Sequence, residues 1–240
     1  MCVDGGDDSC RILDGQDLHL VARIPLEPGP DAGIYDPETR IFYIGNGGRK
    51  GKQPYSYITL VSAAESKTVG RIRVESNNLE AMSIDHSKHL LYVNMRDKNQ
   101  IGVVDLDKNE VRQVWSIPGL NLNTPMQLDT ENHRLFVAGR KPGKLLVINT
   151  ENGQLVTTMD CIETADDMIF DPANRRIYVS GSGGLTIVQQ QGPDTYKAVE
   201  QFTTNAGKTS VLVPDLAQLY VIHTKTPEDN AALQVYKLNQ

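Results

Sequence analysis

The segment His89-Leu-Leu-Tyr-Val-Asn-Met-Arg-Asp-Lys-Asn-Gln-Ile-Gly-Val-Val-Asp105 contains the pattern on which the rest of the chain is built. Two short runs rich in Leu, Ile, Val and Tyr flank a polar loop that contains Arg and Lys. Runs of this length and composition predict β-strands, and no window of the chain carries the i, i+3, i+4, i+7 stripe of an amphipathic helix. We therefore expect an all-β protein.

The same pattern recurs along the chain at nearly regular intervals. Its aromatic residue is found in five units, at separations of 49, 44, 42 and 42 positions. These residues are Tyr43, Tyr92, Phe136, Tyr178 and Tyr220. In each unit the preceding strand ends in aspartate, at Asp36, Asp85, Asp129, Asp171 and Asp215. A period of this length indicates a repeat architecture, in which no unit can bury its apolar face alone.

Each complete unit contains four strand-like pieces. A third strand such as Leu145–Asn149 and a fourth such as Leu155–Met159 follow the aspartate strand and the aromatic strand. Four antiparallel strands per 42–49 residues form the blade of a propeller, and neighbouring blades cover one another's faces. An extended β-solenoid is the alternative, but its repeats are shorter and contain fewer turns. We therefore expect a β-propeller of four-stranded antiparallel blades.

The spacing also divides the chain into blades. We expect one propeller domain over residues 1–240, with about five and a half to six blades. The expected divisions are a partial blade at 1–30, full blades at 31–79, 80–123, 124–164 and 165–207, and a partial last blade at 208–240. Met1 stands 42 residues before Tyr43, so the first blade lacks its inner strand, and the last blade stops after its third strand. Restoring about 70–80 residues would complete seven blades, and we expect the sequence to be an N-terminally truncated form of a seven-bladed protein.

Units such as His89–Asp105 resemble the YVTN-type repeats of the YncE-like, surface-layer-type seven-bladed propellers. The resemblance covers essentially the whole chain. It implies a bacterial or archaeal protein that is exported to the periplasm or the extracellular space in its full-length form. Members of this family mostly have no demonstrated enzymatic activity, and some bind other macromolecules, including DNA. The resemblance therefore implies a binding protein and not an enzyme. The sequence itself begins with an acidic segment, so we expect no signal peptide within it.

Composition excludes several other classes of protein. The 240 residues carry a net charge of −6 and contain no apolar stretch long enough for a membrane helix. No Gly-x-Ser-x-Gly elbow or helix-opening phosphate loop is present, so we expect no catalytic residues of those types and no cofactor. The three cysteines show no zinc spacing. Cys2 and Cys10 flank a turn, which leaves a cross-strand disulfide and a coincidence equally open, and Cys161 is expected to be a small apolar residue near a blade edge.

One set of candidate site residues precedes each aspartate strand. These residues are expected to surround the mouth of the central channel, on the face where propellers usually bind ligands. They are Asp31, Glu80, Thr124, Asp166 and Ser210, with Asp167 beside them. Acidic oxygens suit a hard cation or a cationic ligand. Simple solvation of the channel mouth is the favoured interpretation.

A second set lies in the loops between the second and third strands, on the same face. The residues are Arg49, Lys50, Lys52, Arg96, Lys98, Arg140, Lys141 and Lys144, joined by Lys225. Such an arc is able to hold a phosphate backbone or an acidic polysaccharide. Only Tyr55 and Tyr57 lie nearby as stacking partners. Exposed lysines and arginines are more often solvated loop residues that discourage edge pairing.

Methionine and histidine offer weaker metal candidates. Met82, Met126 and Met168 share one strand position, which suits Cu(I), although packing between blades is the more common role. The five histidines do not converge, and His89 and His133 are expected to be turn residues on the rim. The identity of any metal is therefore unknown.

The leading hypothesis is a non-catalytic binding or scaffold protein that presents its loop face to a macromolecular or extracellular partner. That partner is an unidentified protein, polysaccharide or nucleic acid, and the complete protein is expected to be a monomer without a membrane span. The alternative is a lactonase-like or metal-dependent hydrolase at the channel mouth. Its water-activating groups would be sought among Asp31, Glu80, Asp166 and Asp167. Fold analogy alone does not decide between the two.

Overall fold

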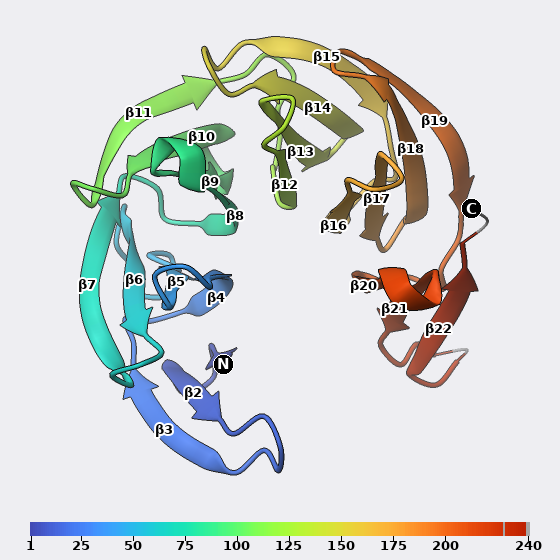
Figure 1. The fold of residues 1–240 in the computed structure, drawn as a ribbon. Helices are drawn as coiled ribbons and strands as arrows, with labels where there is room; N and C mark the ends of the chain where they lie inside the picture. Colours follow the sequence, from blue (N-terminus) through green and yellow to red (C-terminus); the bar gives the residue numbers. More distant parts are fainter. Residues whose placement is uncertain (228, 239–240) are drawn as a thin grey trace. The chain divides into compact units, whose positions relative to one another are not determined.

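The computed structural model describes residues 1–227 and 229–238, which form strands, turns and three short 3-10 helices. The chain forms two compact units, Met1–Ser116 and Ile117–Gln240, each with three antiparallel sheets (Figure 1). These six sheets are blades, so the all-β propeller fold is confirmed, whereas the seven-bladed type stays a prediction. In the described part of the chain, no helix has the length and apolar character to cross a membrane.

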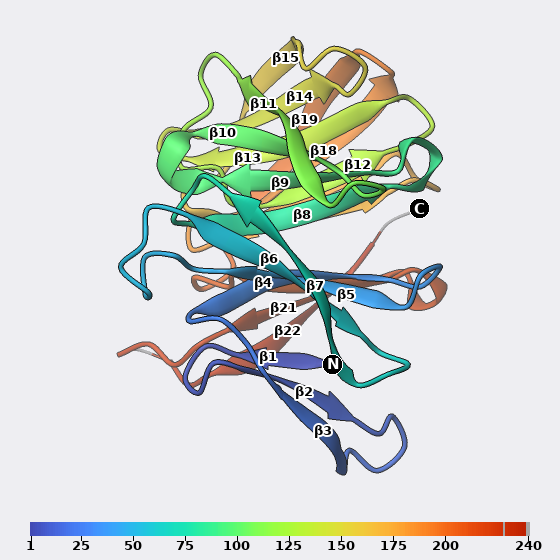
Figure 2. The same ribbon diagram turned by 90° about the vertical axis from the view of Figure 1, so that its left-hand side faces the viewer.

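The first unit stacks its three sheets face to face (Figure 2). The first sheet contains β1 (Cys2–Asp4), β2 (Ser9–Leu13) and β3 (Leu20–Pro25). The second contains β4 (Pro30–Asp36), β5 (Ile41–Asn46), β6 (Ser56–Ser62) and β7 (Lys67–Val74). The third contains β8 (Leu79–Asp85), β9 (Leu90–Met95), β10 (Gln100–Asp105) and β11 (Glu110–Ser116), with the 3-10 turns η1 (His86–Lys88) and η2 (Arg96–Lys98).

The second unit repeats this plan. The fourth sheet contains β12 (Met126–Asp129), β13 (Arg134–Arg140), β14 (Gly143–Asn149) and β15 (Leu155–Asp160). The fifth contains β16 (Ala165–Asp171), β17 (Arg176–Gly181), β18 (Gly184–Gly192) and β19 (Thr195–Phe202). The sixth contains β20 (Thr209–Val213), η3 (Pro214–Leu216), β21 (Gln218–His223) and β22 (Ala232–Lys237).

Strands follow chain order within every sheet, and the described residues give the first and sixth sheets three strands and the others four. By repeat position, β1 to β3 are second, third and fourth strands. The sixth sheet has first, second and third strands. Among the described residues, the first sheet thus has no strand at the first repeat position, and the sixth has none at the fourth.

The turn between the first and second strands of each complete blade is built by a buried aspartate and a left-handed residue. Asp129 Oδ1 accepts a hydrogen bond from the Asn132 N–H at 3.1 Å, and Asp171 Oδ1 accepts one from the Ala173 N–H at 3.1 Å. Short carboxylate side chains stabilise turns in this way. Positive φ angles of 57°, 52°, 55°, 52° and 48° recur three residues before the aromatic position, at Arg40, His89, His133, Arg175 and Ala217. The repeat therefore specifies its turns as well as its strands.

The aromatic residue is buried in the second to fifth sheets and half-buried in the sixth. Tyr43 is 5% exposed, and Tyr92, Phe136 and Tyr178 are fully buried. The ring centroids of Tyr92 and Trp115 are 5.5 Å apart. Aromatic side chains bury roughly 150–250 Å² each and dominate core energetics, so the faces between sheets are the main source of stability within each unit.

The cysteines are all free thiols. Cys2 pairs with Arg11, while Val3 pairs with Cys10. Because successive side chains of a strand point to opposite faces, Cys2 and Cys10 lie on different faces of the hairpin. The suggestion of a cross-strand disulfide is therefore wrong. Cys161 is 8% exposed in an apolar cluster of the second unit, and burial raises its pKa to about 12.

Removing a fully buried side chain from the first unit should lower its stability strongly. Ile58 is 0% exposed in the cluster between the second and third sheets. Ile58→Ala is expected to cost about 2–5 kcal/mol, the lost transfer free energy plus a cavity term. The measurement is urea unfolding followed by the fluorescence of Trp115, which reports this unit. Val69→Ala, at a 43% exposed position of β7, is the control, and equal effects in the two variants would contradict the packing described.

Candidate functional site

A polar pocket of about 330 Å³ lies where the loops of the three sheets of the first unit meet. The loop before β4 contributes Gly29, and β4 itself contributes Asp31. The loop between β5 and β6 contributes Arg49 and Lys50, and Asn78 lies just before β8. The pocket therefore joins one member of the acidic set to two members of the basic set.

Glycine residues form the pocket wall where the loop before β4 meets the loop between β5 and β6. Gly47 donates its N–H to the Gly29 carbonyl at 2.6 Å. Gly29 has φ of +70°, a conformation that L side chains rarely adopt, and a Cβ on Gly47 would lie 3.1 Å from the Gly29 oxygen. A Cβ on Gly48 would lie 1.8 Å from the Tyr55 oxygen. Only glycine permits these approaches, which hold the Arg49–Lys50 corner beside β4.

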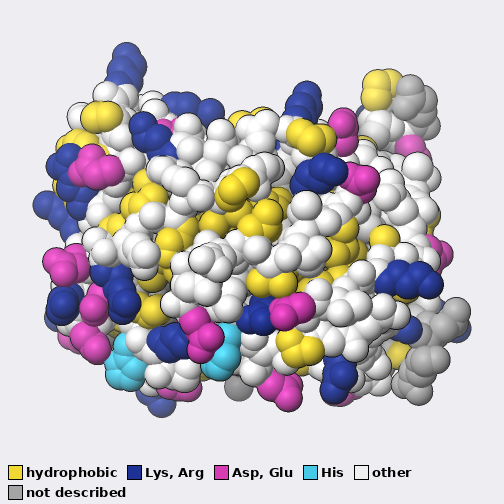
Figure 3. Space-filling model, turned by 90° about the horizontal axis from the view of Figure 1, so that it is seen from above, with side chains coloured by type: hydrophobic (Ala, Val, Ile, Leu, Met, Phe, Trp, Pro, Cys, Tyr) yellow, Lys and Arg dark blue, Asp and Glu magenta, His cyan; other side chains and the backbone are white. Residues whose placement is uncertain are grey.

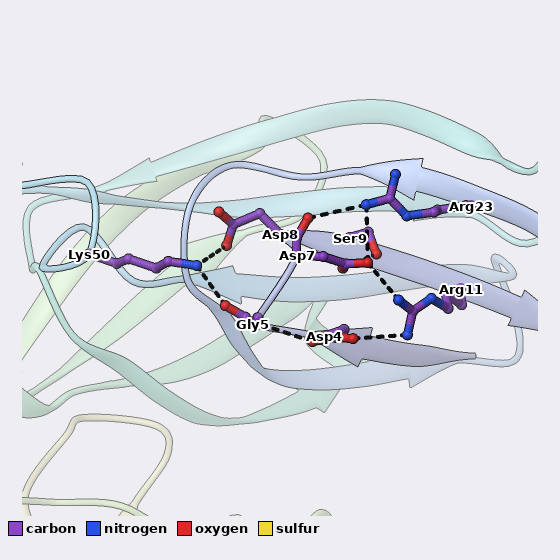
Figure 4. A network of polar contacts seen from close by, with 9 residues as sticks. Asp4, Gly5, Asp7, Asp8, Ser9, Arg11, Arg23 and Lys50 are labelled. Carbon is purple, nitrogen blue, oxygen red and sulfur yellow. Dashed lines mark hydrogen bonds and ion pairs between the residues drawn. The ribbon is translucent and has the colours of Figure 1, made fainter.

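Lys50 ties the second sheet to the acidic loop of the first sheet (Figure 4). Its Nζ donates to the Gly5 carbonyl at 2.6 Å and to Asp8 Oδ1 at 2.7 Å. The Gly29 N–H also donates to Asp8 Oδ1, at 2.9 Å. The hydrogen bond from Lys50 is the largest cause that lowers the pKa of Asp8 below its ordinary value. Lys50 is therefore a positioning residue at the pocket wall and is already neutralised.

A second group of charges orders the same acidic loop. Arg11 donates to Asp4 Oδ2 at 2.9 Å and to Asp7 Oδ2 at 2.5 Å, and Arg23 lies 3.1 Å from Asp7 Oδ2. The Ser9 hydroxyl, also bonded to Asp7, is the first cause that lowers the pKa of Asp7. Figure 4 shows Asp4, Asp7, Ser9 and Arg11 on the β1–β2 hairpin and Arg23 on the neighbouring strand β3. The carboxylates of the acidic loop therefore have partners on β2, on β3 and in the loop before β4, besides Lys50.

Arg49 differs from its neighbour Lys50. Its backbone is fixed, since its N–H donates to the Asn77 carbonyl at 2.9 Å. Its side chain is exposed, and among the described residues its guanidinium has no ion pair or hydrogen bond. Asp31, also exposed, lines the same pocket and likewise has no such partner there. A free guanidinium and a free carboxylate in a glycine-walled pocket suit a ligand that is anionic at one point and carries hydrogen-bond donors nearby.

The remaining acidic candidates are held by protein groups. Glu80 Oε1 accepts from Arg96 at 2.8 Å, and Asp166 lies 3.5 Å from Arg140. Asp167 Oδ2 accepts from the Ser210 N–H at 2.9 Å, and burial raises the pKa of Asp167. Thr124 is 5% exposed and donates to the Leu122 carbonyl at 3.2 Å. Of this set, Asp31 is the member that presents a free carboxylate to a pocket in the described chain.

The basic candidates are mostly neutralised as well. Arg96 and Arg140 bind the acidic set, Lys98 lies 3.8 Å from Asp97, and Lys144 bonds to Asp160. Arg49, Lys52 and Lys141 have no carboxylate partner among the described residues. Figure 3, which views the molecule from above the orientation of Figure 1, shows basic and acidic side chains interspersed on the side that it presents. The structure therefore supports a single contact with an anion at Arg49 better than a long arc of unpaired positive charge.

The aromatic candidates are covered by arginines. The Arg71 guanidinium lies 4.7 Å from the Tyr57 ring centroid, and the Arg73 guanidinium lies 3.8 Å from that of Tyr55. The two rings meet edge to face, 5.6 Å apart. Cation–π contacts of this kind occupy the ring faces that a nucleobase would need.

The metal candidates fall into two groups. Met82, Met126 and Met168 are 6%, 2% and 1% exposed, as packing residues are, and His89 and His133 occupy the left-handed turns. Sequence reasoning missed a different group on the β2–β3 turn, where ligand atoms of Asp14, Asp17 and His19 lie within 4.8 Å of one another. His19 Nδ1 is 2.6 Å from Asp17 Oδ1. Contacts within an exposed acidic turn explain that grouping without an ion.

Comparison with known proteins supports the resemblance drawn from the repeats. No protein-family model matches the chain. The uncharacterized protein YncE of Salmonella typhimurium is 24% identical over 217 residues, which cover 88% of this chain and 58% of that protein. YncE of Salmonella typhi is 23% identical with the same coverage. The chain therefore spans little more than half the length of these relatives, and the resemblance to YncE-like β-propellers is confirmed.

Solved structures show the same fold at low identity. A chain of a mitotic checkpoint complex is 12% identical with a TM-score of 0.78, over 98% of this chain and 70% of that one. A functionally unknown protein from Desulfotomaculum acetoxidans is 11% identical with a TM-score of 0.76, over 97% and 84%. Hydrazine synthase of Kuenenia stuttgartiensis is 13% identical with a TM-score of 0.72, over 89% and 67%. Similarity at this level shows the fold alone.

Replacing Lys50 should raise the pKa of Asp8 towards its ordinary value. In Lys50→Met the donor that contributes most to the depressed pKa is gone. A depressed carboxyl pKa contributes stability above the unfolded pKa that is lost as pH falls through the folded pKa, so the variant should lose less stability on acidification. Carboxyl carbon NMR during a pH titration measures the change. Lys67→Met, which removes the partner of Glu65 at 2.7 Å, is the control. If the pKa of Asp8 is the same in Lys50→Met as in the unmodified protein, the contact between Lys50 and Asp8 is absent in solution.

Proposed function

We propose that this chain is a non-catalytic binding protein that holds an anionic group of a macromolecular partner at the pocket around Arg49. The observation that carries the proposal is the free Arg49 guanidinium beside a glycine-walled pocket of about 330 Å³. Arginine recognises carboxylate and phosphate groups through paired N–H donors. The shared chemistry is therefore a carboxylate or phosphate repeated along a polymer, such as an acidic polysaccharide or a nucleic-acid backbone.

The surroundings of Arg49 favour a contact of moderate strength. Lys50 already donates to Gly5 and Asp8, so it contributes shape more than charge. Asp31 lies in the same pocket and repels an anion. The net charge of −6 adds a weak general repulsion. Selectivity would then come from the carboxylate of Asp31, which accepts hydrogen bonds from hydroxyl or amine groups of the partner.

The proposal also includes where the full-length protein is located. The resemblance to YncE-like propellers supports a periplasmic or extracellular protein in its full-length form. An extracellular place would bring the loop face into contact with polysaccharide or released nucleic acid. Because the chain spans 58% of the length of the relatives it matches, this role is proposed for the region of residues 1–240 and not for a whole protein.

The hydrolase alternative has less support. Water activation at the channel mouth needs carboxylates free to bind a metal or take a proton. Glu80 and Asp166 are each bound to an arginine, and Asp167 accepts two backbone N–H groups. Asp31 remains as a single free carboxylate, and one carboxylate does not make a metal site.

Arg49→Ala should weaken polyanion binding by roughly fivefold to tenfold, the loss of one charge-assisted contact at an exposed site. Asp31→Asn should strengthen it. Polygalacturonate and single-stranded oligothymidylate are the two probes, measured by fluorescence anisotropy or calorimetry at low salt. Binding of one probe alone identifies the source of the anion.

The matched control is Arg112→Ala, because Arg112 is an exposed arginine on β11 that does not line the pocket. The proposal fails if neither probe binds at low salt. It also fails if Arg49→Ala and Arg112→Ala weaken binding equally, since any affinity would then be a general effect of surface charge.

A further inference from the structure

The β18–β19 hairpin of the fifth sheet is extended beyond the length that the repeat requires. β18 has nine residues, whereas the equivalent third strands β10 and β14 have six and seven. The loop at the end of this extension is held against the fourth sheet, because Arg134 donates to Asp194 Oδ1 from Nε at 2.8 Å and from Nη2 at 2.6 Å. The Tyr196 hydroxyl also donates to the Pro193 carbonyl at 2.7 Å. The extension therefore has a fixed position beside the fourth sheet.

The extension encloses a pocket of about 160 Å³ in the second unit. Glu131 comes from the turn between β12 and β13, and Phe170 comes from β16. Pro172 and Arg175 come from the turn between β16 and β17, and Pro193 comes from the hairpin loop. All of these residues belong to the fourth and fifth sheets, so the pocket is separate from the polar pocket of the first unit.

Two of the residues that line the pocket are buried and polar. Gln190 is 3% exposed, and its Nε2 donates to Asp129 Oδ2 at 2.8 Å. Asn132 donates to the same carboxylate, from its N–H to Oδ1 at 3.1 Å and from Nδ2 to Oδ2 at 2.8 Å, so both oxygens of Asp129 have partners. In the described part of the chain, Gln190 Oε1 accepts no hydrogen bond. A buried polar atom without a partner costs free energy, so this oxygen favours a hydrogen-bond donor in the pocket.

Two exposed side chains of opposite charge line the same pocket. Among the described residues, neither Arg175 nor Glu131 has a side-chain ion pair or hydrogen bond. The free guanidinium suits a carboxylate, and the free carboxylate suits an ammonium group. Phe170, Pro172 and Pro193 supply apolar surface beside them. Pockets for small ligands combine apolar walls with a few polar groups in this way.

We propose that this pocket binds a free α-amino acid with an apolar side chain. The carboxylate of the ligand lies at Arg175, and its ammonium group donates to Glu131 and to Gln190 Oε1. An ammonium group has three donors, which is enough for both acceptors. The apolar side chain of the ligand packs against Phe170 and the two prolines. A peptide carries its ammonium and its carboxylate at opposite ends, so a free amino acid is the ligand that presents both charges within a pocket of this size.

The first test is isothermal titration calorimetry of the 240-residue protein with L-leucine, L-valine and L-proline. At least one of them is expected to bind and to raise the melting temperature, because a ligand of the folded state stabilises it. For each amino acid that binds, the N-acetyl derivative removes the positive charge and the carboxamide removes the negative charge. Each derivative should bind at least about tenfold more weakly, since it loses a charge-assisted hydrogen bond. Absence of binding by all three amino acids, or equal binding of either derivative, overturns the proposal.

Two variants locate the binding at this pocket. Arg175→Ala and Glu131→Gln should each weaken binding of the amino acid by at least about fivefold, the loss of one charge-assisted contact at an exposed position. Alanine fits the left-handed turn, because Ala217 occupies the equivalent position of the sixth sheet with φ of +48°, against +52° for Arg175. The matched control is Arg40→Ala, at an exposed arginine in the same repeat position of the second sheet. It should leave binding unchanged.

The melting temperature of each variant without ligand separates loss of the site from loss of the fold. Equal weakening in Arg175→Ala and Arg40→Ala overturns the site, as does unchanged binding in both pocket variants. The proposal does not depend on polyanion binding in the first unit. Arg49→Ala should therefore leave amino-acid binding unchanged, which distinguishes the failure of one proposal from the failure of the other.

Discussion

Burial of apolar residues between neighbouring sheets is the interaction on which the rest of this structure depends. A blade has two apolar faces, and neither is covered by its own residues. Within the first unit, Ile58 and Val93 become fully buried only because the second and third sheets meet. Within the second unit, Phe136 of the fourth sheet is buried against the fifth sheet, and Tyr178 of the fifth sheet is buried against the sixth. Because the hydrophobic effect is roughly proportional to the apolar area removed from water, each sheet depends on its neighbour.

This dependence explains the regularity of the chain. A sheet must present its apolar residues to a neighbour in a fixed register, so a strand cannot slip by one residue without turning its side chains to the wrong face. The turn after the first strand sets that register. A left-handed residue three positions before the aromatic ring recurs in five units, and a buried aspartate accompanies it in four of them. A bulge between the third and fourth strands recurs as well, at Leu60/Val61, Val103/Val104 and Ile187/Val188.

Much of the fold could be predicted from the sequence because its signals are local and repeated. The strand Leu145–Asn149 lies inside β14, and the missing inner strand of the first blade follows from counting back from Tyr43. The candidate site was less predictable, because it depends on which side chains meet. Glu80 and Arg96 were assigned to separate sets, yet they form one ion pair. The register of β8 and β9 shifts between Leu79 and Met82, so counting along the two strands does not bring Glu80 opposite Arg96.

Other features needed three-dimensional information. Cys2 and Cys10 look opposed in the sequence, but the register places Val3 opposite Cys10, and a shift of one residue changes the face. The pairing of Lys50 with Asp8 spans 42 positions and depends on close glycine contacts at Gly29 and Gly47. These contacts neutralise one basic residue and leave its neighbour Arg49 free, a distinction that composition cannot make.

Hydrogen exchange on the 240-residue protein, followed by mass spectrometry, tests the dependence on neighbouring sheets most directly. β10, β14, β18 and β22 occupy the same repeat position, but of these four only β22 lacks a fourth strand in the described chain. The account predicts slow exchange in the first three strands and much faster exchange in β22. Equal protection of all four strands would contradict it, because a third strand would then be stable without its neighbours.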